Sequence, residues 1–178
     1  IAPGSRKIIM VAGFRWEKDQ DTLIKAMAHL PEYFHLFLVG DGVRRKECEA
    51  LAAHTGVAER VHFLGIRSDV PALLHAADYV VMSSHFEGLS LSSVEGMSVG
   101  KPFLASDVDG LREVVKGAGV LFPHGDADSL TNEILKLEKS PELYRSVAGS
   151  CRIHAAEFDI HKMASKYFEQ YQSFLSHE

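Results

Sequence analysis

Residues 79–95 read YVVMSSHFEGLSLSSVE, and this stretch indicates the fold more clearly than any other part of the chain. Its first four residues are apolar on both faces, which is typical of a strand in a parallel sheet that is covered on both sides. Gly88 then supplies a turn and exposes backbone amides, and a helix is expected to begin near Ser90. A buried strand followed by a loop and a helix predicts an α/β architecture.

The same alternation continues in both directions from this stretch. Short apolar runs bounded by Gly, Pro or Asp are expected strands, and they lie at 7–12, 35–39, 61–64, 102–105 and 119–122. Helical patterns are expected at 21–30, 43–54, 69–76, 90–99, 109–115, 126–139, 141–157 and 161–177.

This order of elements predicts a Rossmann-like, doubly wound parallel sheet of about six strands, with helices on both faces and the C-terminal helices packed alongside. Ligands of such sheets bind beyond the carboxyl ends of the strands, where the strand order reverses. We expect residues 1–178 to form a single domain, because 178 residues suit one domain with its own core. The first residues lack an initiator Met and resemble a linker, so we expect a chain cut from a longer protein.

Composition and charge restrict the partners. The net charge of −5 argues against nucleic acid. No apolar run approaches the roughly 20 residues needed to span a bilayer. Cys48 and Cys151 form no C-x-x-C pair and are expected to be reduced thiols in a cytoplasmic protein. The ten His residues form no H-x-H or H-x-x-x-H pattern, so no metal site is expected.

Two glycine-containing motifs are weak. Residues 40–42 (Gly-Asp-Gly) resemble the start of a dinucleotide fingerprint, but Arg45 stands where the third Gly belongs. A tight turn that needs small residues explains the same pattern, and the failed third position argues against a nicotinamide oxidoreductase. Residues 96–101 are one residue short of a phosphate loop, and Pro102 replaces its Ser or Thr, so we reject a P-loop.

Charged side chains gather where the expected strands end. Arg15 and Lys18 follow the first strand together with the only Trp of the chain, and they are either phosphate ligands or part of a solvated turn. The helix N-terminus near Ser90 is suited to bind an anion. Glu95 lies on a helix otherwise made of Leu, Ser, Val, Gly and Met, where a carboxylate needs donors. Either sugar hydroxyls or a nearby basic side chain would supply them.

Seven short segments stand in a characteristic order and spacing. They read FLG at 63–65, DVPALL at 69–74, AAD at 76–78, FEGL at 86–89, EGM at 95–97, GKP at 100–102 and ASDVDG at 105–110. In this order they resemble the C-terminal, donor-binding domain of the GT4-type retaining glycosyltransferases with the GT-B fold (glycosyl transferases group 1). Glu87 and Glu95 are separated by seven residues, as in the E-x7-E motif of that family.

The resemblance also implies roles for residues at matching positions. Glu87 would contact hydroxyls of the donor sugar, Lys18 would neutralise the diphosphate, and these two form the implied catalytic set. Glu95 would hold the ribose hydroxyls. Ile66 and Arg67 would border the nucleobase. The whole implied donor-binding set is Arg15, Lys18, Ile66, Arg67, Glu87, Gly88, Leu89, Ser90, Leu91, Ser92 and Glu95.

What the resemblance implies for function is transfer of a sugar, with retention and without a metal, from a nucleotide diphosphate sugar such as a UDP- or GDP-sugar. The acceptor, a glycan or a lipid, would bind an N-terminal domain across a cleft, so the present chain alone is expected to be inactive. A peripheral association of the full-length protein with a membrane stays open beside the cytoplasmic location.

One position departs from the family pattern. The family commonly has Arg five residues before the Lys that matches Lys18, and Gly13 stands there. Either Arg15 supplies the missing charge or the site carries less charge. The departure motivates the alternative of a non-catalytic nucleotide-sugar-binding or regulatory module of the same fold. A receiver-type signalling domain would need acidic residues after the first strand, and Arg15 is the opposite.

Overall fold

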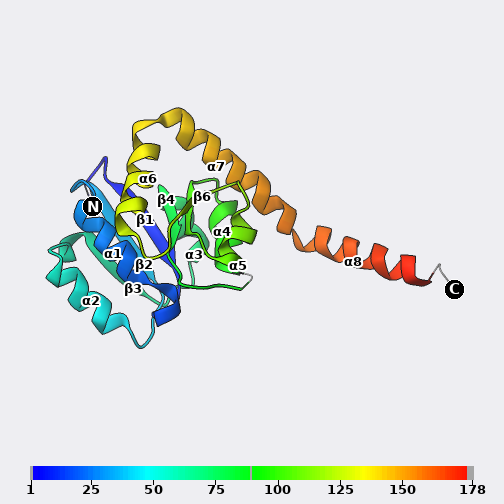
Figure 1. Cartoon of the computed structure of the whole chain (residues 1–178), viewed down its shortest axis with the longest axis horizontal. Coiled ribbons are helices and arrows are strands. Elements are labelled where there is room, and N and C mark those ends of the chain that lie inside the picture. The colour runs from blue at the N-terminus through cyan, green and yellow to red at the C-terminus, as the bar shows by residue number, and fades with distance from the viewer. Residues whose placement is uncertain (1, 89, 176–178) are drawn as a thin grey trace.

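The computed structural model describes residues 2–88 and 90–175. Within them, one parallel sheet has the strand order β3-β2-β1-β4-β5-β6 (Figure 1). The chain leaves β1 toward β3 on one side and continues from β4 to β6 on the other, so the order reverses between β1 and β4. The doubly wound α/β prediction is confirmed, and the expected ligand edge lies at this reversal. The strands are β1 (Arg6–Val11), β2 (Phe34–Val39), β3 (Val61–Gly65), β4 (Tyr79–Met82), β5 (Phe103–Ser106) and β6 (Val120–Phe122).

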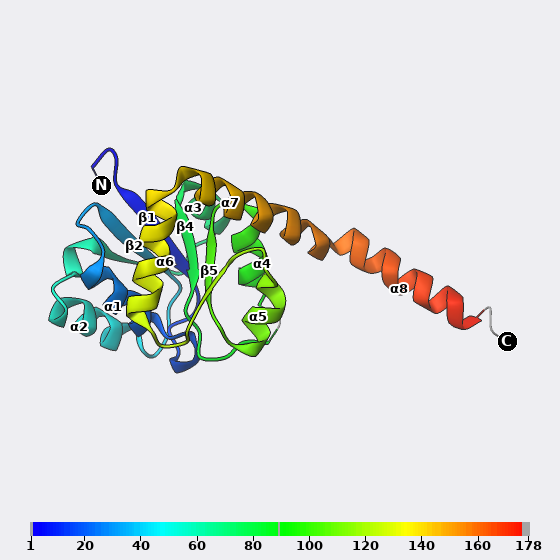
Figure 2. The same cartoon turned by 45° about the horizontal axis from the view of Figure 1, so that its top comes forward.

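Helices cover both faces of the sheet. Helix α1 packs against α2 and α6, whereas α4 packs against α5 and α7 (Figure 2). The predicted bounds agree with the observed ones to within about two residues, the usual uncertainty of helix and strand ends. The α-helices are α1 (Gln20–His29), α2 (Arg45–His54), α3 (Val70–Ala76), α4 (Leu91–Ser98), α5 (Asp109–Val115), α6 (Ala127–Lys139), α7 (Pro141–Ala155) and α8 (Ile160–Leu175), and short 3-10 turns are η1 (Trp16–Lys18), η2 (Ala58–Arg60) and η3 (Ala156–Phe158).

The core lies along strands β1, β2, β4 and β5 and the helices that cover them. Every residue of β4 and β5 is buried, as expected for strands that are covered on both faces. Both cysteines are free and buried. Burial raises the pKa of the Cys48 thiol to about 12, so this thiol is inert near neutral pH.

The last two helices differ in how they meet the body. Helix α7 packs on α4 and buries small residues, among them Ala148 and Cys151. Helix α8 instead extends away from the sheet beyond η3 (Figure 1), which differs from the expectation that both helices pack alongside. Its apolar side chains recur at helical spacing and are exposed: Ile160, Met163, Tyr167, Phe168, Tyr171 and Phe174. In the described part of the chain, no helix combines the length and the apolar character that crossing a membrane requires.

Candidate functional site

The loops after β1 and β4 lie against each other at the carboxyl edge of the sheet, because these two strands are neighbours. The backbone amide of His85 donates to the carbonyl oxygen of Glu17 at 2.8 Å. The buried hydroxyl of Ser83 donates to the carbonyl oxygens of Asp19, at 2.7 Å, and Lys18, at 3.3 Å. These contacts fix one loop on the other and so bring residues far apart in the sequence into one site.

Lys18 and Glu87, which are 69 positions apart, form an ion pair at this edge. The Lys18 Nζ atom lies 2.5 Å from Glu87 Oε1, and the hydroxyl of Ser84 donates to the same oxygen at 2.7 Å. Ser84 is fully buried, and only 9% of the Glu87 side chain is exposed. Both donors use Oε1, and no described side chain donates to Oε2. The second oxygen is therefore available to a ligand hydroxyl.

Gly110 lets the start of α5 approach the backbone of Glu87. A Cβ atom at Gly110 would lie 1.9 Å from the carbonyl oxygen of Glu87, so only glycine fits there. Two hollows are lined in part by Glu87 and Gly88. One, of about 180 Å³, is lined by Arg15, Glu17, Lys18, Phe86, Glu87 and Gly88, and the other, of about 460 Å³, by Glu87, Gly88, Gly110, Glu113, Val114 and Phe158.

The turn that carries Arg15 and Lys18 is held in place by a hydrogen bond to its backbone and by a buried side chain. The side-chain amide of Gln20 donates to the carbonyl oxygen of Gly13 at 2.9 Å, and Phe14 is fully buried beneath the turn. Arg15 itself is exposed. A Cβ atom at Gly13 would lie 3.9 Å from Arg15 Nε, so the Arg15 side chain lies over the position where the resembling family carries Arg. This placement favours Arg15 as the substitute, which stays a prediction.

The glycines at 40 and 42 serve close packing between two loops. Gly40 has φ +133°, and a Cβ atom there would lie 2.2 Å from the carbonyl oxygen of Ala12. At Gly42 the corresponding atom would lie 2.4 Å from the carbonyl oxygen of Phe14. The interpretation as a tight turn is thus correct, and the glycines make room for protein backbone rather than for a dinucleotide.

Helix α4 begins at Leu91, within one residue of the predicted start. Ser90 is its N-cap, and its hydroxyl accepts from the amide of Ser93 at 3.3 Å. Leu91 is exposed and Ser92 is partly buried at the start of the helix, whereas Leu89 lies outside the described residues. A Cβ atom at Gly96 would lie 2.9 Å from side chains of β4 and β5, so glycine lets α4 sit close to the sheet. The first-turn amides of α4 are thereby held at the same edge as Glu87.

Glu95 occupies a different environment from Glu87. Its side chain is exposed and lines a groove of about 190 Å³ between α3 and α4, together with Val70, Pro71, Leu74 and His75 of α3. No basic side chain in residues 2–88 or 90–175 forms an ion pair with it, so the structure does not support pairing with a neighbour. The expectation of a costly carboxylate among apolar neighbours is also wrong, because the sequence of α4 hides that Glu95 points away from the sheet.

Ile66 and Arg67 follow β3 at the same edge. Ile66 is 84% exposed. Arg67 forms a two-pronged ion pair with Asp69, with Nε–Oδ1 and Nη2–Oδ2 distances of 2.8 Å. The hydrogen bond from Arg67 lowers the pKa of the Asp69 carboxyl. The guanidinium is therefore held near the start of α3, next to the groove that Glu95 lines, and its role toward a nucleobase stays a prediction.

Sequence reasoning missed His85 and the buried serines. The His85 ring lies against Trp16 in a tilted arrangement, with ring centroids 4.6 Å apart, and its Nδ1 atom lies 2.5 Å from Nε2 of His124. A signal existed for Ser83 and Ser84, because two hydroxyls directly after an apolar strand must lie at its carboxyl end. No comparable signal marks His124, which reaches the site from the loop after β6.

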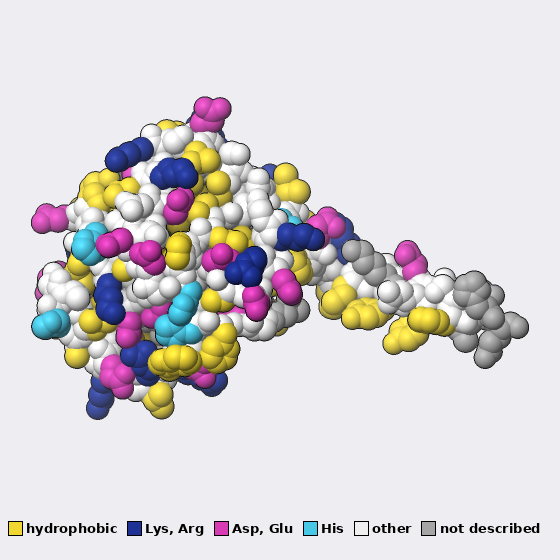
Figure 3. Space-filling view, viewed as in Figure 1, with side chains coloured by type: hydrophobic (Ala, Val, Ile, Leu, Met, Phe, Trp, Pro, Cys, Tyr) yellow, Lys and Arg dark blue, Asp and Glu magenta, His cyan; other side chains and the backbone are white. Residues whose placement is uncertain are grey.

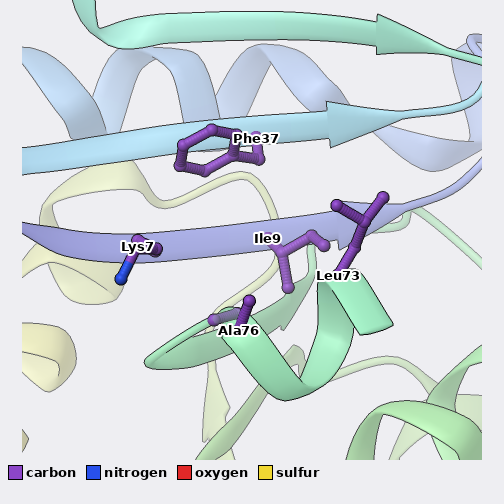
Figure 4. A pocket seen from close by; sticks show the side chains of 6 residues that line it. Lys7, Ile9, Phe37, Leu73 and Ala76 are labelled. Carbon is purple, nitrogen blue, oxygen red and sulfur yellow. The ribbon is translucent and has the colours of Figure 1, made fainter. Parts of the chain in front are cut away.

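The hollow shown in Figure 4 does not belong to the site at the carboxyl edge of the sheet. It has a volume of about 70 Å³, lies between β1, β2 and α3, and is lined by Lys7, Ile9, Phe37, Leu73, Ala76 and Ala77. Lys7 and Ala77 lie at the amino ends of β1 and β4, opposite the ligand edge. None of the predicted site residues lines it, and its walls are almost wholly apolar, so we interpret it as a packing gap under α3.

The sequence and the fold of this chain are similar to those of known glycosyltransferases. The family described as glycosyl transferases group 1 matches residues 1–150. The lipopolysaccharide glucosyltransferase WaaG of Escherichia coli (strain K12) is 32% identical over 157 residues, which cover 84% of this chain and 41% of WaaG. The N,N'-diacetylbacillosaminyl-diphospho-undecaprenol alpha-1,3-N-acetylgalactosaminyltransferase of Campylobacter jejuni is 28% identical over 166 residues, which cover 92% of this chain and 44% of that enzyme.

A solved structure shows the same architecture. The crystal structure of Anabaena Alr3699/HepE in complex with UDP superposes with a TM-score of 0.89 and 28% identity, over 95% of this chain and 49% of HepE. HepE has also been crystallised with UDP-glucose. The chain spans less than half the length of the curated relatives described above.

Proposed function

Because this chain belongs to the glycosyl transferases group 1 family, we propose that it is the donor-binding half of a glycosyltransferase that transfers a sugar, with retention, from a nucleotide diphosphate sugar such as a UDP- or GDP-sugar. The observation that carries the proposal is the Lys18–Glu87 pair beside the N-terminus of α4. A cation, a helix N-terminus and a carboxylate with one unused oxygen suit a diphosphate joined to a sugar.

The chemistry requires that negative charge be stabilised as the diphosphate leaves the sugar. Lys18 and the first-turn amides of α4 would receive that charge, with Arg15 as a second cation. Glu87 Oε2 would accept a hydroxyl of the sugar while Ser84 keeps Oε1 in place. In the free chain Lys18 is neutralised by Glu87, so the donor competes with this ion pair for the ammonium group.

A metal is not required by this proposal, because Lys18, Arg15 and the backbone amides supply the positive charge. Glu95 would hold the ribose in the groove between α3 and α4, and Ile66 and Arg67 would border the base. In this arrangement the nucleotide crosses the carboxyl edge from β3 toward β4. Retention of turnover after removal of divalent cations by chelation is the expected result for the full-length protein.

The proposal includes an N-terminal domain across the cleft that binds the acceptor glycan or lipid, so that the present chain alone turns over little or no donor. The length of the relatives supports a further domain, since this chain matches less than half of each of the two enzymes compared above. The exposed apolar side of α8 also supports it, because a surface of this kind normally packs against protein. A cytoplasmic location is part of the same proposal.

Calorimetric titration of the chain with UDP, GDP, ADP and UDP-glucose tests donor binding. One nucleoside diphosphate should bind, and Lys18→Ala should weaken it at least about tenfold, the effect of losing roughly 1.4 kcal/mol. Lys25→Ala, at an exposed position on α1, is the matched control and should leave binding unchanged. If Lys18→Ala binds every nucleotide as the parent chain does, the proposal is wrong.

A second candidate, a non-catalytic nucleotide-sugar-binding or regulatory module, is favoured by Gly13 at the family's Arg position. Both candidate functions include binding of the nucleotide sugar, but only the glycosyltransferase would turn it over. Hydrolysis of the donor, or its transfer to an acceptor, by the full-length protein would decide for the enzyme. Tight donor binding with no turnover would decide for the module.

A further inference from the structure

Two exposed aromatic side chains lie on the same loops as Lys18 and Glu87. Trp16 is 59% exposed and Phe86 is 57% exposed, and their ring centroids are 6.0 Å apart. Figure 3 shows hydrophobic side chains gathered beside histidines at the lower edge of the body, where η1 lies in Figure 1. The nucleotide-sugar site proposed above uses neither ring, so their exposure needs another explanation.

The Trp16 ring rests on side chains that are themselves held in place. The His85 ring lies against Trp16 in a tilted arrangement, with ring centroids 4.6 Å apart, and contacts His124, and its Nδ1 atom lies 3.7 Å from the buried carboxylate of Asp19. The His85 backbone is also bound to Glu17. A ring that is already ordered loses little conformational entropy on binding, which makes it a good contact surface.

The surroundings of the rings select the kind of ligand. Phe86 forms one wall of the 180 Å³ hollow, whose other walls carry Glu17 and three residues assigned above to the donor, Arg15, Lys18 and Glu87. Trp16 does not line the hollow and follows Arg15 directly in the chain, so the two rings lie at the border of the proposed donor site. A pyranose ring has an apolar C–H face for an aromatic wall and hydroxyls on its rim for charged groups. A lipid tail or an apolar peptide would desolvate these charges without pairing them, which is unfavourable.

We propose that Trp16 and Phe86 form an aromatic shelf that binds a sugar ring of the acceptor, next to the donor sugar at Glu87. The inference rests on the proposed function, because an acceptor hydroxyl must reach the sugar carbon from which the diphosphate departs. It also goes beyond that function, since the acceptor would otherwise be bound entirely by the N-terminal domain. The donor half would then supply one wall of the acceptor site.

Trp16 is the only tryptophan of the chain and so reports on the shelf directly. The full chain is saturated with UDP and then titrated with methyl glycosides of glucose, galactose, mannose and N-acetylglucosamine while Trp16 emission is recorded. At least one glycoside should change the emission saturably at millimolar concentration. Phe86→Ala should weaken that glycoside at least about fivefold, and Tyr33→Ala, an exposed aromatic at the amino end of β2, should not.

Separate measurements distinguish this inference from the proposed function. Calorimetry with UDP alone tests the donor site. If UDP binds but no glycoside alters Trp16 emission, or if Phe86→Ala binds the glycoside as well as the parent chain, the shelf is wrong and the donor site stands. If glycosides bind the shelf and no nucleotide binds, the shelf stands and the donor site is wrong. Emission that responds to phosphatidylglycerol vesicles and not to glycosides would assign the rings to a lipid surface and overturn the inference.

Discussion

Glu87 and Glu95 stand eight positions apart on either side of the first turn of α4, and they differ in burial and in the partners of their carboxylates. Glu87 has 9% of its side chain exposed and is held by Lys18 and Ser84. Glu95 is exposed, and within the described residues it has no ion-pair partner. The first carboxylate is oriented before a ligand arrives, whereas the second would be oriented by the ligand. Two glutamates of one sequence motif can therefore differ in whether neighbouring side chains orient them before a ligand binds.

The largest expected effect belongs to the oriented carboxylate. Glu87→Ala in the full-length enzyme should lower sugar transfer by roughly a hundredfold, because the sugar loses a fixed partner at its reacting end. Binding of the nucleoside diphosphate should not weaken, since removal of Glu87 releases Lys18 from the ion pair with which the donor competes. Transfer assays with calorimetry check both parts, and Glu32→Ala, an exposed carboxylate before β2, is the control. Equal loss of transfer and of nucleotide binding would show that Glu87 is not specific to the sugar.

The next effect tests whether orientation itself matters. Ser84→Ala removes a buried hydrogen bond to a charged group, worth about 1.5–3 kcal/mol, and should lower transfer about tenfold or more while nucleotide binding changes little. Ser98→Ala is the counterpart beside Glu95, because the Ser98 hydroxyl donates only to the Glu95 carbonyl oxygen. It should leave transfer unchanged. If both variants behave alike, the contrast between the two carboxylates has no functional meaning.

Glu95→Gln keeps the shape of the unpaired carboxylate and removes its charge. Bonds from ribose hydroxyls to a charged acceptor are worth about 1.5–3 kcal/mol, so the nucleoside diphosphate should bind at least about tenfold more weakly. The melting temperature of the free chain should not change, because no described side chain depends on this carboxylate. Unchanged affinity by calorimetry would remove Glu95 from the site.

The smallest expected effect is the coupling between the two cations, which also differ in whether they have a partner. Lys18 is paired, whereas Arg15 is exposed beside Gly13. If both neutralise one diphosphate, the loss in the double Ala variant should differ from the sum of the single losses. Salt should weaken binding more in the parent chain than in the variants, because screening acts on the charge that was removed.

One control and one measurement decide whether Arg15 binds the diphosphate or belongs to a solvated turn. A nucleoside without phosphates should bind all variants alike. If Arg15→Ala binds the diphosphate as the parent chain does, Arg15 belongs to a solvated turn and Lys18 acts alone. That result would favour the non-catalytic module.

Local pattern was enough to predict the sheet, because strands such as Tyr79–Met82 are short, apolar on both faces and bounded by turn residues. The predicted site residues that follow β1 and β4 do lie at one edge for the same reason. The Lys18–Glu87 pair could not be foreseen from either segment, because it depends on β1 and β4 being neighbours in the sheet. The exposure of Glu95 depends on the rotation of α4 about its axis, which the mixed composition of that helix does not reveal.

Helix α8 carries a consequence for engineering. Its 16 residues extend about 24 Å from the body, at 1.5 Å per residue, with an aromatic and aliphatic side that no other described segment covers. Whatever surface covers that side must match it in shape, so substitutions in either one are constrained by the other. If this chain is the donor half proposed above, a chimera that joins it to a foreign acceptor half should be soluble only if α8, or its counterpart, is exchanged together with that half.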